Sequence, residues 1–336
     1  MTVTTPLSSG AAPVRERRHD VDLLRVVCTA AVVLCHTAAV FVDAGHRTTG
    51  HAADALTRFA VPAFFAMAGW AALAASPVRG EGQLLRRADR IVRPMALWTL
   101  LYVAWRGTPE DAAAALSGSV EAAFHLWYLY VYVPLLLVLG AMVLLVRERG
   151  RTAPWWTVGL LAVCAFGGAA RADLGEAAGL GLPGWEWGLS LYPLGYALLG
   201  AGLLGAARRP GPRWPWAVAA AGCLAALTVY QLGFRFPAAY ASLPVAALTF
   251  AVLGAFRGVR VPRRWRGPVE RLSDASFGAY LVHLAPVTAL SALLADRVPH
   301  GGPALLAMAA VAVASTAVSF ALAHLWGRLG LRAWLG

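Results

Sequence analysis

An arginine and a histidine lie inside the first long apolar stretch of the chain. The stretch covers residues 21–42 and contains Arg25 and His36. An ionisable side chain within a membrane-length apolar segment is costly to bury, so such residues mark candidate functional sites. Arginine suits phosphate binding through parallel hydrogen bonds, and histidine can take a proton from a hydroxyl group near neutral pH. The pair therefore indicates anion binding and proton transfer.

The spacing of Arg25 and His36 places both on one face of the predicted helix. Eleven residues at about 100° each give about 1,100°, which is about 20° more than three full turns. At about 1.5 Å per residue the two positions are about 16 Å apart along the axis. This suits a long donor whose anionic head stays at the membrane surface. The alternative is that Arg25 extends to the interface and His36 packs through an interhelical hydrogen bond; the spacing leaves both open.

A second group of arginines lies between the second and third apolar segments. Arg87 and Arg90 are three residues apart, as are Arg90 and Arg93, so each pair shares a helical face. Several guanidinium groups on one face would clamp phosphates at the mouth of a site. The alternative for each arginine is an interfacial position that reflects only the charge bias of membrane loops.

Two further histidines stand among aromatic residues. His125 opens the fourth apolar segment with Trp127 and Tyr128, and aromatic residues are typical of a membrane interface. His283 lies in the ninth segment with Tyr280 on the same face, where a catalytic role and structural hydrogen bonding are equally compatible with the pattern. All four cysteines lie within apolar segments without a CxxC motif, so we expect neither a metal site nor a disulfide framework.

The composition predicts the elements that position these residues. The chain has 336 residues, of which 59% are hydrophobic and 14% charged, against about half and about a quarter in an ordinary globular domain. We predict an all-α, polytopic integral membrane protein with about ten transmembrane helices, each needing about 20 apolar residues. The predicted segments are 21–42, 54–75, 92–106, 124–146, 155–170, 185–206, 214–232, 237–256, 275–295 and 303–326.

The net charge of +12 is distributed unevenly over the predicted loops. Alternating the loops places 22 arginines on the side of the N-terminus and six on the other, which predicts that both termini are cytoplasmic. The excess of positive charge is then explained by the orientation of the chain in a lipid bilayer, which is the expected partner, and not by binding to nucleic acid. We expect residues 1–20 to form a cytoplasmic tail and residues 21–336 a single membrane domain with no appended soluble domain. The six arginines on the far side are Arg47, Arg58, Arg106, Arg171, Arg235 and Arg297.

Other polar residues in the outer loops are expected to be solvated and are candidates for sugar contacts only. They are His46, Arg47, His51, Asp54, Glu110, Asp111, Glu121, Asp173, Glu176 and Glu186.

Five short motifs follow one another along the chain. They are Asp22-Leu-Leu-Arg25 with His36, which forms R-x10-H; Arg58 to Gly69, with Val-Pro-Ala-Phe-Phe; Arg87-Ala-Asp-Arg90; His125-Leu-Trp-Tyr-Leu129; and Ser276-Phe-Gly-Ala-Tyr-Leu-Val-His283. In this order they resemble the acyltransferase-3 family, multi-spanning membrane enzymes that acylate sugars of bacterial surface polysaccharides, peptidoglycan and some secondary metabolites. Ala68 departs from the family pattern, which usually has serine there.

The resemblance implies an acyl-coenzyme A donor, expected to be acetyl-coenzyme A, used as a substrate and not as a bound cofactor. It implies a hydroxyl group of a sugar, glycan or glycosylated metabolite as acceptor, and a multi-pass location in a bacterial plasma membrane. By position, His36 would be the catalytic base, or would itself be acylated first. Donor binding would fall to Arg25, Arg87, Arg90 and Arg93. Supporting positions would be Asp22, His125, Trp127, Tyr128, Tyr280 and His283.

A transporter or flippase remains the alternative, because buried charge also lines substrate paths in membranes. Such a protein would move its substrate without consuming an acyl donor.

Overall fold

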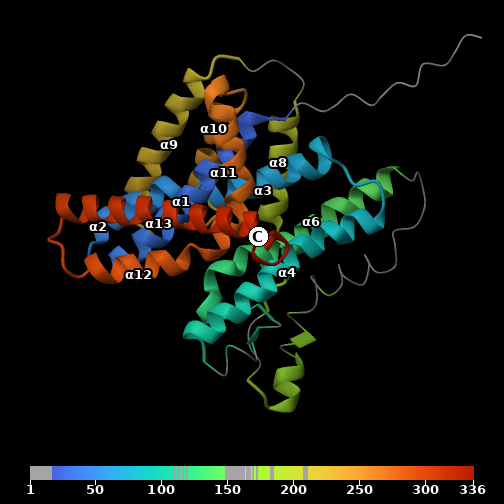
Figure 1. The fold of residues 1–336 in the computed structure, drawn as a ribbon, viewed down its shortest axis with the longest axis horizontal. Coiled ribbons are helices and arrows are strands. Elements are labelled where there is room, and N and C mark those ends of the chain that lie inside the picture. The colour runs from blue at the N-terminus through green and yellow to red at the C-terminus, as the bar shows by residue number, and fades with distance from the viewer. Residues whose placement is uncertain are drawn as a thin grey trace, which may run out of the picture.

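The described part of the chain is almost entirely helical (Figure 1). A computed structural model describes residues 17–108, 120–147, 185–206 and 211–336, with single residues and short runs between 111 and 118 and between 163 and 181. Within these ranges the β-structure is one isolated bridge between Gly118 and Trp185. The prediction of an all-α fold is confirmed for the described residues.

The helices follow one another along the chain, with η1 a π-helix and η2 a 3₁₀-helix. They are α1 (His19–Asp43), α2 (Arg47–Thr57), α3 (Ala60–Gly69), η1 (Trp70–Ala75), α4 (Glu81–Arg106), η2 (Glu121–Leu126), α6 (Trp127–Arg147), α8 (Leu191–Gly205), α9 (Trp214–Gly233), α10 (Leu243–Phe256), α11 (Arg263–Val282), α12 (Leu284–Leu294), α13 (Gly302–Arg328) and α14 (Arg332–Leu335).

Proline and glycine mark several of these boundaries. Pro215, Pro244 and Pro303 lie in the first turns of α9, α10 and α13, where a missing N–H leaves no helical hydrogen bond unmade. Gly330 has a φ of 75° directly after α13, a left-handed conformation that favours glycine and ends helices.

Five helical segments are long and apolar enough to cross a membrane, or six if the bent pair α11–α12 is one span. The shorter helices α8 and α10 are apolar as well and coincide with two more predicted segments. The predicted segment 92–106 is the second half of α4, whose first half carries the arginine group. Most of the predicted segment 155–170 lies outside the described residues.

The predicted segment 54–75 is not one uniform helix. The chain enters it earlier, at Arg47, and divides it into α2, α3 and the π-helical turn η1. Asp54 and Arg58, which the loop assignment placed in solvent, are buried instead. That assignment was wrong for both residues because their charges are paired with each other.

The predicted segment 275–295 is broken at His283. Its first part belongs to α11, which begins at Arg263, and the axis then bends by 64° into α12. Pro286 explains the break, because it has no N–H to donate to the carbonyl of Val282 and its ring clashes with that carbonyl in a continuous helix. The predicted segment therefore corresponds to a bent pair of helices and not to one continuous helix.

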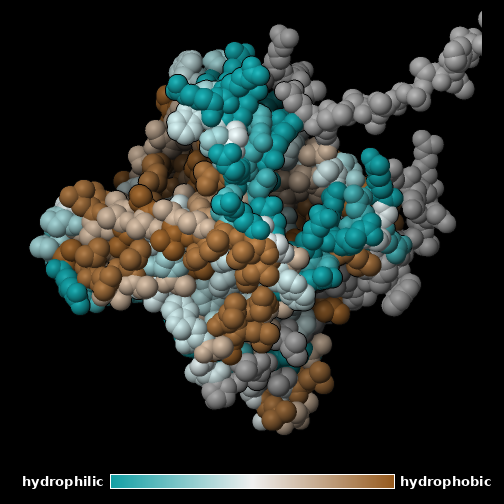
Figure 2. Space-filling view, in the orientation of Figure 1, coloured by the Kyte–Doolittle hydropathy of each residue, from teal (hydrophilic) through white to brown (hydrophobic). Residues whose placement is uncertain are grey.

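Apolar side chains cover much of the outer surface. Figure 2 shows them as a brown field over α12 and α13, while hydrophilic residues gather over the α10–α11 end and the first turns of α4. Leu306 and Val313 of α13 are 72% and 70% exposed, and Val229 of α9 is 64% exposed. Water-exposed surfaces of this kind are unfavourable, and lipid is the solvent that matches them. The protein is a multi-pass membrane protein.

α1 lies at the centre of the bundle, packed against α2, α3, α11, α12 and α13. A second tight contact joins α3 and α8. A Cβ atom at Gly69 would lie 1.9 Å from the carbonyl oxygen of Ala197, and one at Gly200 would lie 1.9 Å from that of Ala66. The two backbones thus approach through small residues, as in membrane helix pairs generally.

Replacing Gly200 with alanine is expected to destabilise the protein, because the new methyl group overlaps the α3 backbone. Overpacking of this kind costs about 1–3 kcal/mol or more. The matched control is Gly202→Ala on the same helix, where a Cβ atom meets open space. Thermal unfolding in detergent should show a lower midpoint for Gly200→Ala only. Equal midpoints for the two variants would contradict this account of the contact.

Candidate active site

Three histidines from distant parts of the chain meet inside the bundle. His36 comes from α1, His125 from η2, and His283 from the break between α11 and α12. The ring centroids of His36 and His283 are 5.0 Å apart, those of His125 and His283 are 5.2 Å apart, and those of His36 and His125 are 6.2 Å apart. We call these residues the histidine cluster.

The three members of the histidine cluster differ in burial and hydrogen bonding. His125 and His283 are 1% and 0% exposed, whereas His36 is half-buried. Both ring nitrogens of His125, and Nε2 of His283, are buried without a hydrogen-bond partner. Buried polar atoms nearly always have partners, and exceptions often occur where a ligand binds. The histidine cluster therefore has unused hydrogen-bonding capacity beside one accessible ring.

The helix break supplies backbone atoms that hold the histidine cluster in place. The carbonyl of Tyr280 accepts a hydrogen bond from Nδ1 of His283, and the carbonyl of Leu281 accepts one from the Tyr102 hydroxyl at 3.0 Å. Tyr102 in turn packs its ring against that of His125, with centroids 4.6 Å apart. The Tyr280 hydroxyl donates to the carbonyl of His125 at 2.5 Å. Side chains and freed carbonyls thus fix the geometry.

A cavity of about 220 Å³ runs between Arg25 and the residues around the histidine cluster. Its lining includes Val32, one helical turn before His36, and Tyr280, whose ring lies 5.6 Å from that of His283. The wall is mainly apolar, with hydroxyl groups from a few residues. These are Tyr128, Tyr132, Ser276 and Tyr280. A narrow chain with an occasional polar group fits such a space.

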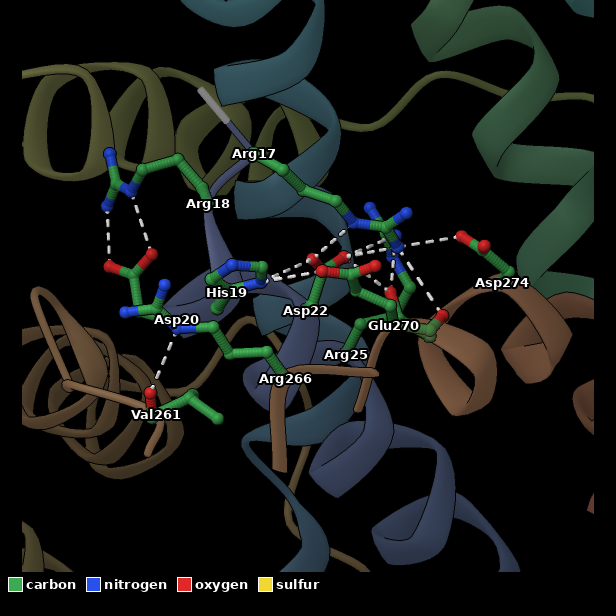
Figure 3. Close-up of polar contacts among 11 residues, drawn as sticks. Arg17, Arg18, His19, Asp20, Asp22, Arg25, Val261, Arg266, Glu270 and Asp274 are labelled. Atoms are coloured by element: carbon green, nitrogen blue, oxygen red, sulfur yellow. Dashed lines mark hydrogen bonds and ion pairs between the residues drawn. The ribbon is translucent and has the colours of Figure 1, made fainter. Parts of the chain in front are cut away.

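Arg25 stands at the other end of this cavity, within a network of charges (Figure 3). Its Nη1 donates to the Ser273 hydroxyl at 2.9 Å, and that hydroxyl donates to Asp22 at 2.7 Å. Asp22 also accepts from Nε of Arg17 at 2.8 Å, while Arg17 reaches Asp274 at 2.8 Å. Hydrogen bonding to Asp22, supported by Asp274, raises the pKa of Arg17 above its ordinary value. Arg17 therefore stays charged.

The predicted alignment of Arg25 and His36 is visible in their partners. Arg25 contacts Ser273 on α11, and His36 contacts His283 at the end of the same helix. Both residues of α1 therefore face α11, as the spacing predicted.

The predicted arginine clamp is only partly assembled. Arg87 is half-buried and lies within electrostatic range of the Tyr132 hydroxyl, as Arg25 does. Arg90 is exposed and is not part of the cavity lining. Arg93 instead pairs with Asp89 at 2.6 Å and lies over the ring of Trp334 at 5.9 Å. Of the four predicted arginines, Arg25 alone lines the cavity, and Arg93 is paired with Asp89.

Comparison with known proteins places this site in a family. A model of the acyltransferase-3 family, described as an acyltransferase domain, matches residues 18–324. The chain belongs to the acyltransferase-3 family. A search of curated proteins and a search of solved structures each found no match. The matched range contains the cavity, the histidine cluster and all five motifs.

Within this membrane acyltransferase, two predicted supporting residues have different positions. Tyr128 lines the cavity, and its ring lies 6.0 Å from that of Tyr280. Trp127 stacks on Tyr240 at 5.7 Å, with an angle of 24° between the rings. Trp127 therefore packs on the far side of its helix from the cavity. His125, for which an interfacial aromatic belt was the alternative, is part of the buried histidine cluster.

The sequence patterns did not predict one buried polar group of this acyltransferase, which is centred on Asp54. Asp54 accepts hydrogen bonds from Nε and Nη2 of Arg58 at 2.5 and 2.6 Å, and from Gln231 of α9 at 2.9 Å. The Cys35 thiol lies 3.4 Å from Asp54 as well. The i, i+4 spacing of Asp54 and Arg58 was the available signal, since it allows an ion pair along one helix face.

His46 was also assigned to a solvated loop and is buried instead, with 4% exposure. Its Nε2 lies 2.9 Å from the carbonyl of Ala295, and its Nδ1 lies 2.9 Å from that of His300. These bonds join the α1–α2 turn to the segment between α12 and α13. Among the described residues, no group of three or more His, Cys, Asp or Glu side chains is arranged to bind a metal ion.

Replacing Arg58 with alanine is expected to destabilise the protein by about 3–5 kcal/mol, because the buried Asp54 carboxylate loses its counter-charge. The matched control is Arg93→Ala, since Arg93 and Asp89 have the same i, i+4 spacing but are 50% and 44% exposed. An exposed pair contributes at most about 1 kcal/mol. In detergent, the free energy of unfolding should therefore fall much more for Arg58→Ala than for Arg93→Ala. A similar loss in both would show that burial does not control the contribution of Arg58.

Proposed function

We propose that this protein is an O-acyltransferase that moves an acyl group, expected to be acetyl, from acyl-coenzyme A to a hydroxyl group of a sugar, glycan or glycosylated metabolite. The observation that supports this most is the cavity between Arg25 and the surroundings of His36. Its lining includes Arg25 and Val32, which is one helical turn before His36, so the cavity extends from an anion-binding group toward a candidate base. The family supports acyl transfer, and the acceptor class is inferred from the motif resemblance.

In this proposal the phosphates of coenzyme A bind at the arginine end. Arg25 is held in place by Ser273, and its side chain is still 36% exposed. Arg87 acts electrostatically on the same Tyr132 hydroxyl as Arg25 does, and Arg90 is three residues further along α4. Guanidinium groups bind phosphate oxygens through parallel hydrogen bonds. The pantetheine arm would then extend along the cavity, with the hydroxyls of Tyr128, Tyr132 and Ser276 available to its amide groups.

The chemical step assigned to His36 is general base catalysis. His36 takes the proton of the acceptor hydroxyl while the hydroxyl oxygen attacks the thioester carbonyl carbon. The tetrahedral intermediate then collapses, the carbon–sulfur bond breaks, and the coenzyme A thiolate takes the proton back from His36. His36 is suited to this role because it is the member of the histidine cluster that retains an accessible surface. Correctly positioned bases contribute about 10²–10⁴-fold to such steps.

The topology that accompanies this function is also part of the proposal. Helix ends on the side of the α1 N-terminus carry most of the arginines, which favours cytoplasmic termini and a donor that arrives from the cytoplasm. About ten spans and a bacterial plasma membrane complete the proposal.

Replacing His36 with alanine should lower acyl transfer by at least about 10²-fold, because the general base is lost. The assay uses purified protein, radiolabelled acetyl-coenzyme A and a panel of candidate glycans. The matched control is His324→Ala, since His324 lines a groove between α11 and α13 and not the central cavity. Both variants should keep a near-normal melting temperature. Full activity of the His36 variant would overturn the assignment, and label that never leaves the donor would favour a transporter.

Replacing Arg87 with glutamine should raise the KM for acetyl-coenzyme A by about tenfold or more, because a charge-assisted hydrogen bond contributes about 1.5–3 kcal/mol. Arg93→Gln is the control, since Arg93 is already paired with Asp89. It should change the KM much less. The effect of Arg87→Gln should also shrink at high salt, as expected for a screened phosphate contact. A larger effect of Arg93→Gln would contradict the position proposed for the donor phosphates.

A further inference from the structure

His283 is completely buried, yet its Nε2 atom has no hydrogen-bond partner. Its Nδ1 atom lies against the backbone carbonyl of Tyr280. A carbonyl oxygen only accepts hydrogen bonds, so Nδ1 must carry the hydrogen. A neutral imidazole with its hydrogen on Nδ1 has a free lone pair on Nε2. His283 therefore presents an unused acceptor inside the bundle.

The break between α11 and α12 is what makes this tautomer possible. Inside a continuous helix the carbonyl of Tyr280 would accept the N–H of Leu284. Among the described residues, the backbone bonds across the break run from His283 to Ala279 and from Val287 to His283, and neither uses the Tyr280 carbonyl. The carbonyl is thus free for the side chain of His283.

The unused acceptor lies beside the ring of His36. The two ring centroids are 5.0 Å apart and the rings are tilted by 42°, so the two imidazoles are direct neighbours. Among the described residues, the ion pairs that involve a histidine are those of His19, and no ring of the histidine cluster is paired with a carboxylate. A base that takes up a proton here has no negative charge to stabilise it. The surroundings offer instead a neutral hydrogen-bond acceptor, which is Nε2 of His283.

We propose that His283 is a positioning residue for His36. When the substrates are bound, its Nε2 accepts a hydrogen bond from one N–H of His36, and the other nitrogen of His36 is left bare to take the proton of the acceptor hydroxyl. When that nitrogen takes the hydroxyl proton, His283 stabilises the resulting imidazolium through the same hydrogen bond. The proton then passes from His36 to the departing thiolate, so His283 neither gains nor loses a proton over the cycle.

This arrangement parallels the way a buried carboxylate orients a catalytic histidine. Here the orienting group is a neutral imidazole and not a carboxylate. An ionised carboxylate deep in a membrane is costly to keep without a partner. A neutral imidazole held by a backbone carbonyl provides the acceptor without a permanent charge. The inference rests on the proposed function, in which His36 is the base.

The test compares three replacements of His283 in purified, full-length protein. His283→Gln places an amide oxygen near the position of Nε2, while His283→Asn places its amide near the position of Nδ1. His283→Leu removes both. We expect His283→Leu and His283→Asn to lower kcat by about 10²-fold, with the KM for acetyl-coenzyme A within about threefold of wild type. His283→Gln should recover most of kcat.

A purely structural role predicts a different result. The Gln and Asn variants would then lose activity in parallel with their melting temperatures, and wild-type kcat in a folded His283→Leu variant would also overturn the proposal. In either case an inactive His36→Ala variant leaves the proposed function standing. Full activity of His36→Ala would instead remove the proposed function itself, so the two failures are distinguishable.

A measurement on protein with an intact His283 covers the case in which its variants do not fold. Nitrogen NMR of histidine-labelled wild-type protein should show Nε2 of His283 without a hydrogen, and its signal should shift when His36→Ala removes the neighbouring ring. A hydrogen on Nε2 of His283, or a signal indifferent to the loss of His36, would overturn the proposal.

Discussion

The break between α11 and α12 is the constraint on which the site depends. Pro286 cannot continue the helix, and the axis bends by 64°. The bend frees two carbonyls, which hold His283 and Tyr102, and Tyr102 packs against His125. Because α1 packs along α11 and α12, the break also places His283 against His36. One interruption of a helix thus organises residues from four parts of the chain.

Polar groups inside this acyltransferase fall into two classes. Asp54 and Arg58 neutralise each other and accept further support from Gln231, so they resemble a structural pair. The network of Arg17, Asp22 and Ser273 ties the start of α1 to α11 in the same way. The histidine cluster is different, because its hydrogen-bonding atoms are buried and partly unused. A low-dielectric interior makes such atoms costly, which is why they are the natural place for a reacting substrate.

The cavity connects these two classes of polar group. At one end Arg25 is anchored by Ser273 and presents guanidinium surface for an anion. At the other end the cavity reaches Tyr280, which bonds to His125 and packs against His283. The residues at both ends of the cavity lie within the range that matches the acyltransferase-3 family.

The sequence by itself determined the class of fold, the face shared by Arg25 and His36, and the family, because hydrophobic length, helical period and short motifs are local properties. It also identified His125, Tyr280 and His283 as candidates, although it left their roles open. Tertiary structure decided that His125 is buried, that Arg93 is occupied by Asp89, and that Asp54 and Arg58 are not loop residues. It also decided the bend at His283. These outcomes depend on which distant groups come to share a low-dielectric space, and a one-dimensional pattern does not specify the partner that neutralises a buried charge.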